Sequence, residues 1–234
     1  ARRVWGGVIA YLHLRPWMVE RILAPGSSIP EKELAASVGV SRTPRREGLK
    51  ARETQGFVKK LANGRLVVVP LSPRDLSDLY SVRATIERLI VKYVASESTD
   101  EEIRESLAPI ISDIRNSLQS SPARASRHGE RFHYAMAEMC QNSVARDFLC
   151  ELRERIARYR SIGPDNIPER RDQAAQEHLK IYELLAARQV EEAANAMEEH
   201  IDRSQEAALR FLAGDLKGEI AEIAEIAEIL EYKD

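Results

Sequence analysis

The feature that most constrains the fold is a helical hydrophobic period, which begins after Pro73 and continues almost to the end of the chain. In its first segment, apolar side chains recur at intervals of three and four residues: Leu76, Leu79, Tyr80, Val82, Ile86, Leu89, Ile90 and Tyr93. This spacing places them on one face of an α-helix. The same period predicts helices over about residues 74–96, 100–119, 123–140, 144–161, 167–187 and 190–213. Because the connections are short, neighbouring helices should run antiparallel in a bundle.

The segment before Pro70 follows a different pattern, in which glycine and proline separate short elements. A short helix leads into a turn, and a second helix begins at Ser41 as its N-cap and ends at Gly56. Two strand-like segments then flank Asn63-Gly64, a favoured hairpin turn, in a loop that Leu61-Ala62 can lengthen. Helix, turn, helix and two-stranded hairpin together predict a winged helix-turn-helix.

The predicted fold class is therefore mainly α: an N-terminal winged helix-turn-helix followed by an all-α antiparallel helical bundle. The predicted boundaries are 1–70 for the DNA-binding domain, 71–73 for a linker, 74–218 for the helical domain and 219–234 for a helical tail that repeats Glu-Ile-Ala.

The net charge of the chain changes sign at the first of these boundaries. Residues 1–70 hold 13 Lys and Arg against 5 Asp and Glu, and the remainder holds 22 against 32. The net charges of +8 and -10 predict a basic nucleic-acid-binding module joined to an acidic domain.

Composition excludes several other classes of protein. Hydrophobic residues make up 44% of the chain and charged residues 31%, which is enough apolar material to build a core and argues against wholesale disorder. No stretch approaches the roughly 20 apolar residues that cross a bilayer, and the first residues lack the apolar run of a signal peptide. Two cysteines do not make a disulfide framework. These patterns predict a cytoplasmic protein without a membrane partner.

The second helix of a helix-turn-helix places its N-terminal part in the major groove. Here that part carries three guanidinium groups, which can contact phosphates and the edges of guanine bases. Basic side chains on the wing add charge near the backbone, and a glycine at the tip allows close approach. The predicted DNA-contacting residues are Ser41, Arg42, Thr43, Arg45, Arg46, Lys59, Gly64 and Arg65. A solvated basic helix face is the alternative, but the turn, the N-cap and the wing together favour DNA binding.

Three histidines, His133, His178 and His200, lie in three different predicted helices, each among apolar neighbours at helical spacing. Neutral imidazoles that point into one small bundle can converge on a transition metal. The alternative is three separate core histidines, because residues on separate helices need not meet. Spacing alone leaves both interpretations open and favours the second.

Several motifs resemble a known family. Leu23-Ala24-Pro25-Gly26, Gly39-Val40-Ser41-Arg42-Thr43-Pro44 and Gly56-Phe57-Val58 resemble the DNA-binding domain of GntR-type bacterial transcription regulators. Asp75-Leu76, Asp78-Leu79-Tyr80 and Val82-Arg83 resemble the start of the FCD-type effector domain found in the FadR branch. The resemblance covers about residues 15–213. It implies a homodimer whose winged helices bind a palindromic operator.

The resemblance also implies site residues in the helical domain. His133, His178 and His200 fall where the FCD domain has its three metal-binding histidines, which implies a divalent transition metal such as Zn or Ni. The position of the family's fourth ligand, an aspartate, is Gly129 here, so water or the carboxylate of an effector would complete the site, or the metal is lost.

The likeness further implies that Arg83 binds a small carboxylic acid, with Tyr80 and Asn142 nearby. From the residues alone, an i,i+4 ion pair between Arg83 and Glu87 is the competing interpretation.

The sequence thus predicts a ligand-responsive transcription regulator that is not an enzyme. Its predicted partners are operator DNA, a small carboxylic acid and a second copy of the chain, in the bacterial cytoplasm and on the nucleoid when bound to DNA. One alternative is a helical metalloenzyme in which a three-histidine metal activates water, although no clear general base, nucleophile motif or glycine-rich phosphate loop supports it. Another is a DNA-binding protein with an empty effector pocket.

Overall fold

The computed structural model describes residues 26–29, 53, 56–117, 122–160 and 168–231. The chain divides into two compact units: residues 1–72 with 151–161, and residues 73–150 with 162–234. The first is called the winged unit below, and the second the helical unit. The predicted DNA-contacting residues of the second helix lie outside the described residues: Ser41, Arg42, Thr43, Arg45 and Arg46.

The predicted wing is present as an antiparallel hairpin of β1 (Val58–Lys60) and β2 (Leu66–Val68). The connecting loop has five residues, 61–65, and is therefore longer than a two-residue Asn-Gly turn. Gly64 adopts a φ of 83°, in the left-handed region that favours glycine. The side-chain oxygen of Asn63 accepts a hydrogen bond from the backbone N–H of Arg65 at 3.0 Å. The basic residues predicted for DNA contact on this wing are exposed: Lys59 and Arg65.

The winged unit has a small core to which the end of α7 (Ser143–Arg160) contributes. Phe57 is fully buried in this unit, and so are Ile156 and Tyr159 from the second half of α7. The Tyr159 hydroxyl accepts a hydrogen bond from the backbone N–H of Ser72 at 3.3 Å. One helix therefore supplies its first residues to the helical unit and its last residues to the winged unit.

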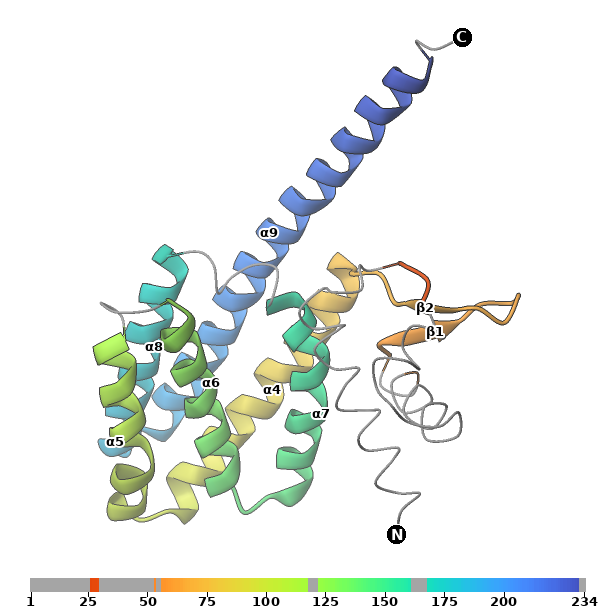
Figure 1. Cartoon of the computed structure of the whole chain (residues 1–234). Coiled ribbons are helices and arrows are strands. Elements are labelled where there is room, and N and C mark those ends of the chain that lie inside the picture. The colour runs from red at the N-terminus through yellow and green to blue at the C-terminus, as the bar shows by residue number, and fades with distance from the viewer. Residues whose placement is uncertain (1–25, 30–52, 54–55, 118–121, 161–167, 232–234) are drawn as a thin grey trace, which may run out of the picture. The chain divides into compact units, whose positions relative to one another are not determined.

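The structure contains every helix that the hydrophobic period predicts after Pro73 (Figure 1). Their bounds are α4 (Pro73–Glu97), α5 (Asp100–Ser117), α6 (Pro122–Met139), α7, α8 (Pro168–Ala186) and α9 (Val190–Glu231). The structure differs from the prediction at the C-terminus. There the predicted helix over 190–213 and the predicted tail form one continuous helix, because neither Gly214 nor the Glu-Ile-Ala repeat interrupts it.

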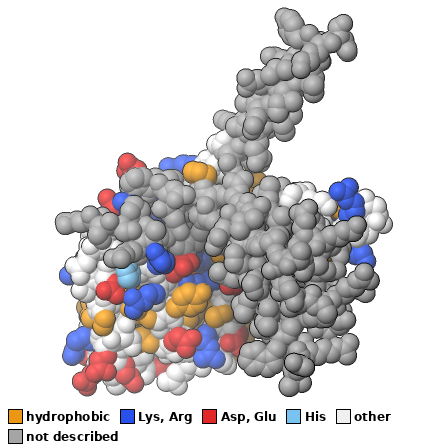
Figure 2. All heavy atoms as spheres, in the orientation of Figure 1, with side chains coloured by type: hydrophobic (Ala, Val, Ile, Leu, Met, Phe, Trp, Pro, Cys, Tyr) orange, Lys and Arg blue, Asp and Glu red, His pale blue; other side chains and the backbone are white. Residues whose placement is uncertain are grey.

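The core of the helical unit lies between α4, α5, α6, α8 and α9. Helix α4 packs along α9, α8 packs against α9 and α5, and α6 packs against α5, α8 and α4. Fully buried large side chains fill the centre, among them Leu76, Tyr80, Ile90, Leu107, Phe132 and Met136. Acidic and basic side chains both appear over the described part of the outer face (Figure 2). No described helix has both the length and the apolar character of a membrane span.

Arg188 joins the turn after α8 to the turn after α4. Its backbone has a φ of 58°, and its N–H bonds to the carbonyl of Leu185 at 3.0 Å, as at the end of many helices. Its side chain donates to the carbonyls of Ala95 and Ser98 at 2.7 and 2.8 Å and to Asp100 at 2.6 Å. The guanidinium thus satisfies carbonyls at the end of α4 that have no partner within the helix.

Replacement of Arg188 by alanine is expected to lower the free energy of unfolding by about 1–2 kcal/mol, because these carbonyls lose a charged donor. Glycine removes the same hydrogen bonds but adopts the left-handed conformation without the penalty of about 1 kcal/mol that alanine carries there. The glycine variant should therefore be the more stable of the two in urea unfolding. A glycine variant less stable than the alanine variant would contradict this role for the backbone conformation.

Candidate metal centre

The three predicted histidines meet inside the helical unit. His133 comes from α6, His178 from α8 and His200 from α9, and the three side chains are only 3–4% exposed. The Nε2 atom of His133 lies 3.1 Å from that of His178 and 3.2 Å from that of His200. Each histidine thus presents a nitrogen to one common point, and these are the described residues whose ligand atoms cluster within 4.8 Å of one another.

Local sequence explains why each ring points inward. His133 follows Phe132 and precedes Met136 by three residues on the buried face of α6. His178 lies three residues after Ala175 and three before Ile181, and both of these are buried. His200 lies beside Ile201 on the face of α9 that packs against α4 and α8. The histidines therefore occupy core positions of their helices.

Glu87 of α4 holds His133 from the side opposite to the common point. One oxygen, Oε2, hydrogen-bonds with Nδ1 of His133, and the other, Oε1, accepts from Nε of Arg83 at 2.6 Å. Arg83 is 5% exposed and Glu87 2% exposed, so this is a buried ion pair. The i,i+4 ion pair that competed with effector binding in the sequence analysis is therefore present.

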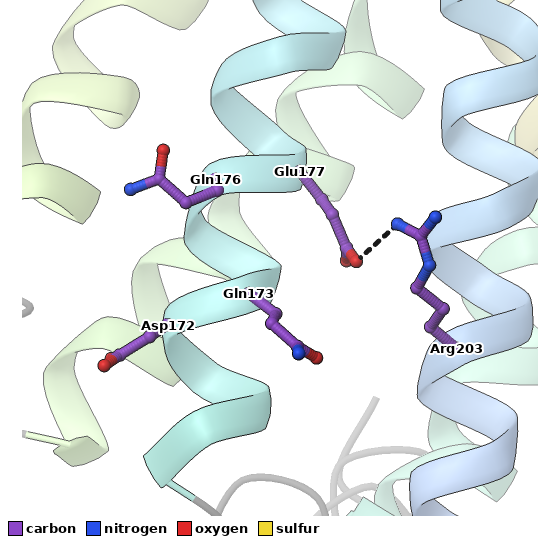
Figure 3. Close-up of a pocket in the computed structure, with 5 residues that line it drawn as sticks. All are labelled: Asp172, Gln173, Gln176, Glu177 and Arg203. Carbon is purple, nitrogen blue, oxygen red and sulfur yellow. Dashed lines mark hydrogen bonds and ion pairs between the residues drawn. The ribbon is translucent and has the colours of Figure 1, made fainter.

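Glu177 of α8 holds His200 in the same way. Its Oε2 lies 2.7 Å from Nδ1 of His200 and accepts from the buried Arg170 at 2.9 Å. Its Oε1 accepts from Arg203 of α9 at 2.9 Å. Figure 3 shows Glu177 pointing across to Arg203 at a surface pocket of about 480 Å³, which Asp172, Gln173 and Gln176 also line. One carboxylate therefore connects a ring of the buried cluster with the surface.

The two carboxylates determine where the imidazole hydrogens lie. An ionised carboxylate only accepts hydrogen bonds, so Nδ1 of His133 and Nδ1 of His200 carry the hydrogens. In the neutral rings, each Nε2 then carries a lone pair, and these two lone pairs face one another at 3.2 Å. Two buried acceptors at this distance repel one another unless a cation or a proton lies between them.

Burial keeps these rings neutral. It lowers the pKa of His133 to about 3, although the charge of Glu87 opposes the shift. It also lowers the pKa of His178 well below the usual value, where the other two rings add to the effect, and it lowers the pKa of His200. Burial by itself raises the pKa of Glu177, but hydrogen bonds from His200 and Arg203 outweigh it and bring the pKa to about 2.

The donor set fits a divalent transition metal. Zn²⁺, Ni²⁺ and related ions bind neutral imidazole, and a hydrogen bond from the other ring nitrogen to a carboxylate is the usual second-shell arrangement. His133 and His200 have such carboxylates. The ring of His178 instead rests against Phe132, with ring centres 5.0 Å apart, and lies over Gly129.

Of the three predicted effector residues, Arg83 and Tyr80 lie next to the histidine cluster, whereas Asn142 caps a helix. Tyr80 is buried and lies under the guanidinium of Arg83, which is 5.5 Å from the ring centre. Both therefore adjoin the histidine cluster through Glu87. The side-chain oxygen of Asn142 accepts from the backbone N–H of Ala145 at 3.1 Å, so Asn142 caps the start of α7.

Comparison with known proteins adds evidence of a different kind. The pattern described as "Bacterial regulatory proteins, gntR family" matches residues 9–68, and that of the FCD domain matches residues 78–203. The "Nta operon transcriptional regulator" of Aminobacter aminovorans is 32% identical over 190 residues, which are 81% of this chain and 88% of that protein. The "HTH-type transcriptional repressor NanR" of Cronobacter sakazakii is 27% identical over 203 residues, covering 78% and 77%. The structure of "E. coli McbR/YncC" superposes with a TM-score of 0.72 at 17% identity, covering 88% and 97%.

Proposed function

Because the chain belongs to the GntR family of bacterial regulatory proteins and carries an FCD domain, we propose that it binds a palindromic operator as a homodimer. A small carboxylic acid bound in the helical unit would change its affinity for that DNA. The chain is a transcription regulator and not an enzyme, so the metalloenzyme alternative is set aside. The observation that carries the effector proposal is the buried three-histidine cluster, which lies in the same chain as a DNA-binding module.

The DNA contacts are proposed from the sequence and the wing. Residues 41–46 would enter the major groove, and the exposed Lys59 and Arg65 would contact phosphates beside it, with Gly64 at the tip. The wing supports this role because its basic side chains face solvent instead of pairing across the hairpin. The protein would act on DNA in the bacterial cytoplasm.

The proposed effector site combines the three histidines with Arg83. A divalent transition metal such as Zn or Ni would be held by the three Nε2 atoms, where it would remove the repulsion between facing lone pairs. Bound there, it would act as a Lewis acid towards a carboxylate. The buried guanidinium of Arg83 would attract the same anion and is kept in place by Glu87.

Communication between the units would follow the chain segments that join them. The chain passes from one unit to the other beside Pro73, within α7 after Cys150, and again after α7. An effector that binds one arrangement of the two units more tightly shifts the population towards it, and by no more than that difference in affinity. The connection within α7 is a continuous helix, so we propose that it transmits the change.

The DNA-binding part of the proposal is tested with an operator fragment selected from random DNA by the protein itself. Arg46→Ala is expected to weaken operator binding by about 1–3 kcal/mol, because a guanidinium at this position would contact a base or phosphate. Fluorescence anisotropy at several salt concentrations measures the loss. Lys180→Ala, which removes an exposed charge from the helical unit, is the matched control and should leave the affinity unchanged. Equal affinities of the Arg46 and Lys180 variants would contradict the proposed interface.

The effector part has its own test. Operator affinity is measured with and without Zn²⁺ and candidate carboxylic acids, and acid affinity is measured with and without operator. Binding free energies are reciprocal, so an acid that changes the affinity for the operator by some factor must have its own affinity changed by the same factor when the operator is bound. Equal acid affinity in both states would show that the acid does not regulate DNA binding.

A further inference from the structure

The three buried rings differ in what lies on the side of each that faces away from the common point. Nδ1 of His133 meets Glu87, which is 2% exposed, and the ring of His178 rests against a fully buried phenylalanine. Nδ1 of His200 meets Glu177, whose side chain is 11% exposed and lines the surface pocket formed by α8 and α9 (Figure 3). Of the three rings, His200 therefore has the outer partner that is most exposed.

Arg203 covers this carboxylate from the solvent side. Its Nη1 donates to Oε1 of Glu177 at 2.9 Å, and its Nη2 donates to Glu199, one turn earlier on α9, at 3.1 Å. The side chains of Arg203 and Glu199 are 51% and 56% exposed. Ion pairs in which the cation is hydrated contribute little to stability, so they open readily. The contact that separates the partner of His200 from the pocket is therefore a weak one.

Arg170 holds the other oxygen of the same carboxylate from within the core. Its Nη2 donates to Oε2 of Glu177 at 2.9 Å, to the carbonyl of His200 at 3.2 Å and to the hydroxyl of Ser204 at 2.9 Å. Its Nε and Nη1 are buried and find no acceptor in the described part of the chain. A buried donor without an acceptor is unfavourable, and a water molecule can satisfy it. Entry of water from the pocket would therefore relieve a cost that the closed arrangement carries.

We propose that Arg203 is a latch on the histidine cluster: when it releases Glu177, His200 becomes accessible from the surface pocket, and the cluster exchanges with solvent by this route. Glu177 and Arg203 are then positioning residues that act through the ring of His200. The pocket, of about 480 Å³, has room for a metal ion with several waters, since each water occupies about 30 Å³ in the liquid. Passage of a metal rests on the proposed function, whereas opening of the latch is a property of the metal-free protein as well.

Hydrogen exchange at the ring nitrogens tests the latch without a metal. The full-length protein is labelled with ¹⁵N-histidine, freed of metal with a chelator and studied by NMR at neutral pH. Arg203→Met removes the hydrogen bonds of the guanidinium and keeps most of the side-chain volume. It is expected to speed exchange of the Nδ1–H of His200 with water about fivefold, the effect of losing one partly exposed ion pair. Exchange at His133 should stay unchanged, because Glu87 is buried elsewhere in the core.

Two further variants separate a latch from a general loss of stability. Arg210→Met is the matched control, because Arg210 lies on the same helix and its ion pair with Glu206 is exposed on both sides. It should leave the exchange rates of both rings unchanged. Arg203→Lys keeps the charge and a donor, so it should restore much of the protection of His200. The latch is overturned if Arg203→Met exchanges no faster at His200 than Arg210→Met, or if it accelerates His133 by the same factor.

Metal exchange provides a second, independent measurement. Uptake of Co²⁺ by the metal-free protein and its release to excess chelator are followed by stopped-flow absorbance. Arg203→Met should speed uptake and release by about the same factor, so the affinity changes much less than the rates, because the latch closes in both states. Unchanged rates would overturn the route through the pocket. If the parent binds no Co²⁺, the metal site of the proposed function is wrong, and hydrogen exchange at His200 still decides on the latch.

Discussion

Lowering the pH from 7 to 5 is expected to reduce the free energy of unfolding of the metal-free protein by several kcal/mol. The unfolded chain binds a proton on each histidine below a pH of about 6.5. His133 stays neutral in the folded protein until its pKa of about 3, and His178 also stays neutral well below the usual value. The unfolded state therefore binds more protons, and the stability that is complete above pH 6.5 is lost as the pH falls. Between pH 6.5 and 5 this amounts to about 2 kcal/mol for His133 alone, at 1.36 kcal/mol per pH unit.

Urea unfolding at pH 7, 6 and 5 in the presence of a chelator measures this effect. His133→Asn keeps a polar side chain but cannot titrate, so its stability should fall less steeply over the same range. Glu177 does not contribute in this window, because its pKa is lowered to about 2 and its share is lost only below pH 4.5. Equal slopes in the parent and the variant would contradict the assignment of the effect to the buried ring.

Glu87→Ala is expected to lower the free energy of unfolding by about 3–5 kcal/mol, the second large effect. The substitution leaves Arg83 as a buried charge without its carboxylate, and it removes the acceptor for Nδ1 of His133. Removal of one partner from a buried ion pair costs this much, because the remaining charge cannot be hydrated. Equilibrium unfolding in urea, monitored by helical circular dichroism, measures the loss.

Two controls test the reason for the loss. Arg83→Met combined with Glu87→Leu removes both charges and keeps the volume, so the double variant should be much more stable than Glu87→Ala. Arg210→Ala breaks an i,i+4 ion pair with Glu206 whose side chains are 80% and 63% exposed, and it should cost less than about 1 kcal/mol. If Glu87→Ala costs no more than Arg210→Ala, the pair with Arg83 does not stabilise the fold as proposed.

The helices were predictable because their signals are local. The apolar period places the helix ends within a few residues, and in the structure Thr99 caps the start of α5 by exchanging hydrogen bonds with Glu102. The hairpin was also found, and its loop of residues 61–65 is longer than the favoured Asn63-Gly64 turn, as Leu61-Ala62 allowed. The continuation of α9 through residues 214–231 was missed, because the three-residue Glu-Ile-Ala repeat was interpreted as a separate tail.

The sequence predicted the candidate metal centre only in part, because helix packing cannot be read from residue spacing. Spacing placed three histidines on the buried faces of three helices, but whether His133, His178 and His200 meet depends on how those helices pack. Only the family resemblance favoured convergence beforehand. Arg170 was missed altogether, since its neighbours on α8 are polar and its partners Glu177 and Ser204 include a residue on another helix.

The winged unit is discontinuous in sequence, and this restricts how such a regulator can be taken apart or recombined. A fragment cut after Ser72 would leave behind the last part of α7, with Ile156 and the hydroxyl of Tyr159 that bonds to Ser72. Apolar surface that these side chains cover would then face water. A chimaera that joins this winged unit to the effector domain of another protein would need an effector domain that supplies its own copy of the last part of α7. The winged unit and the helical unit can therefore be exchanged only together.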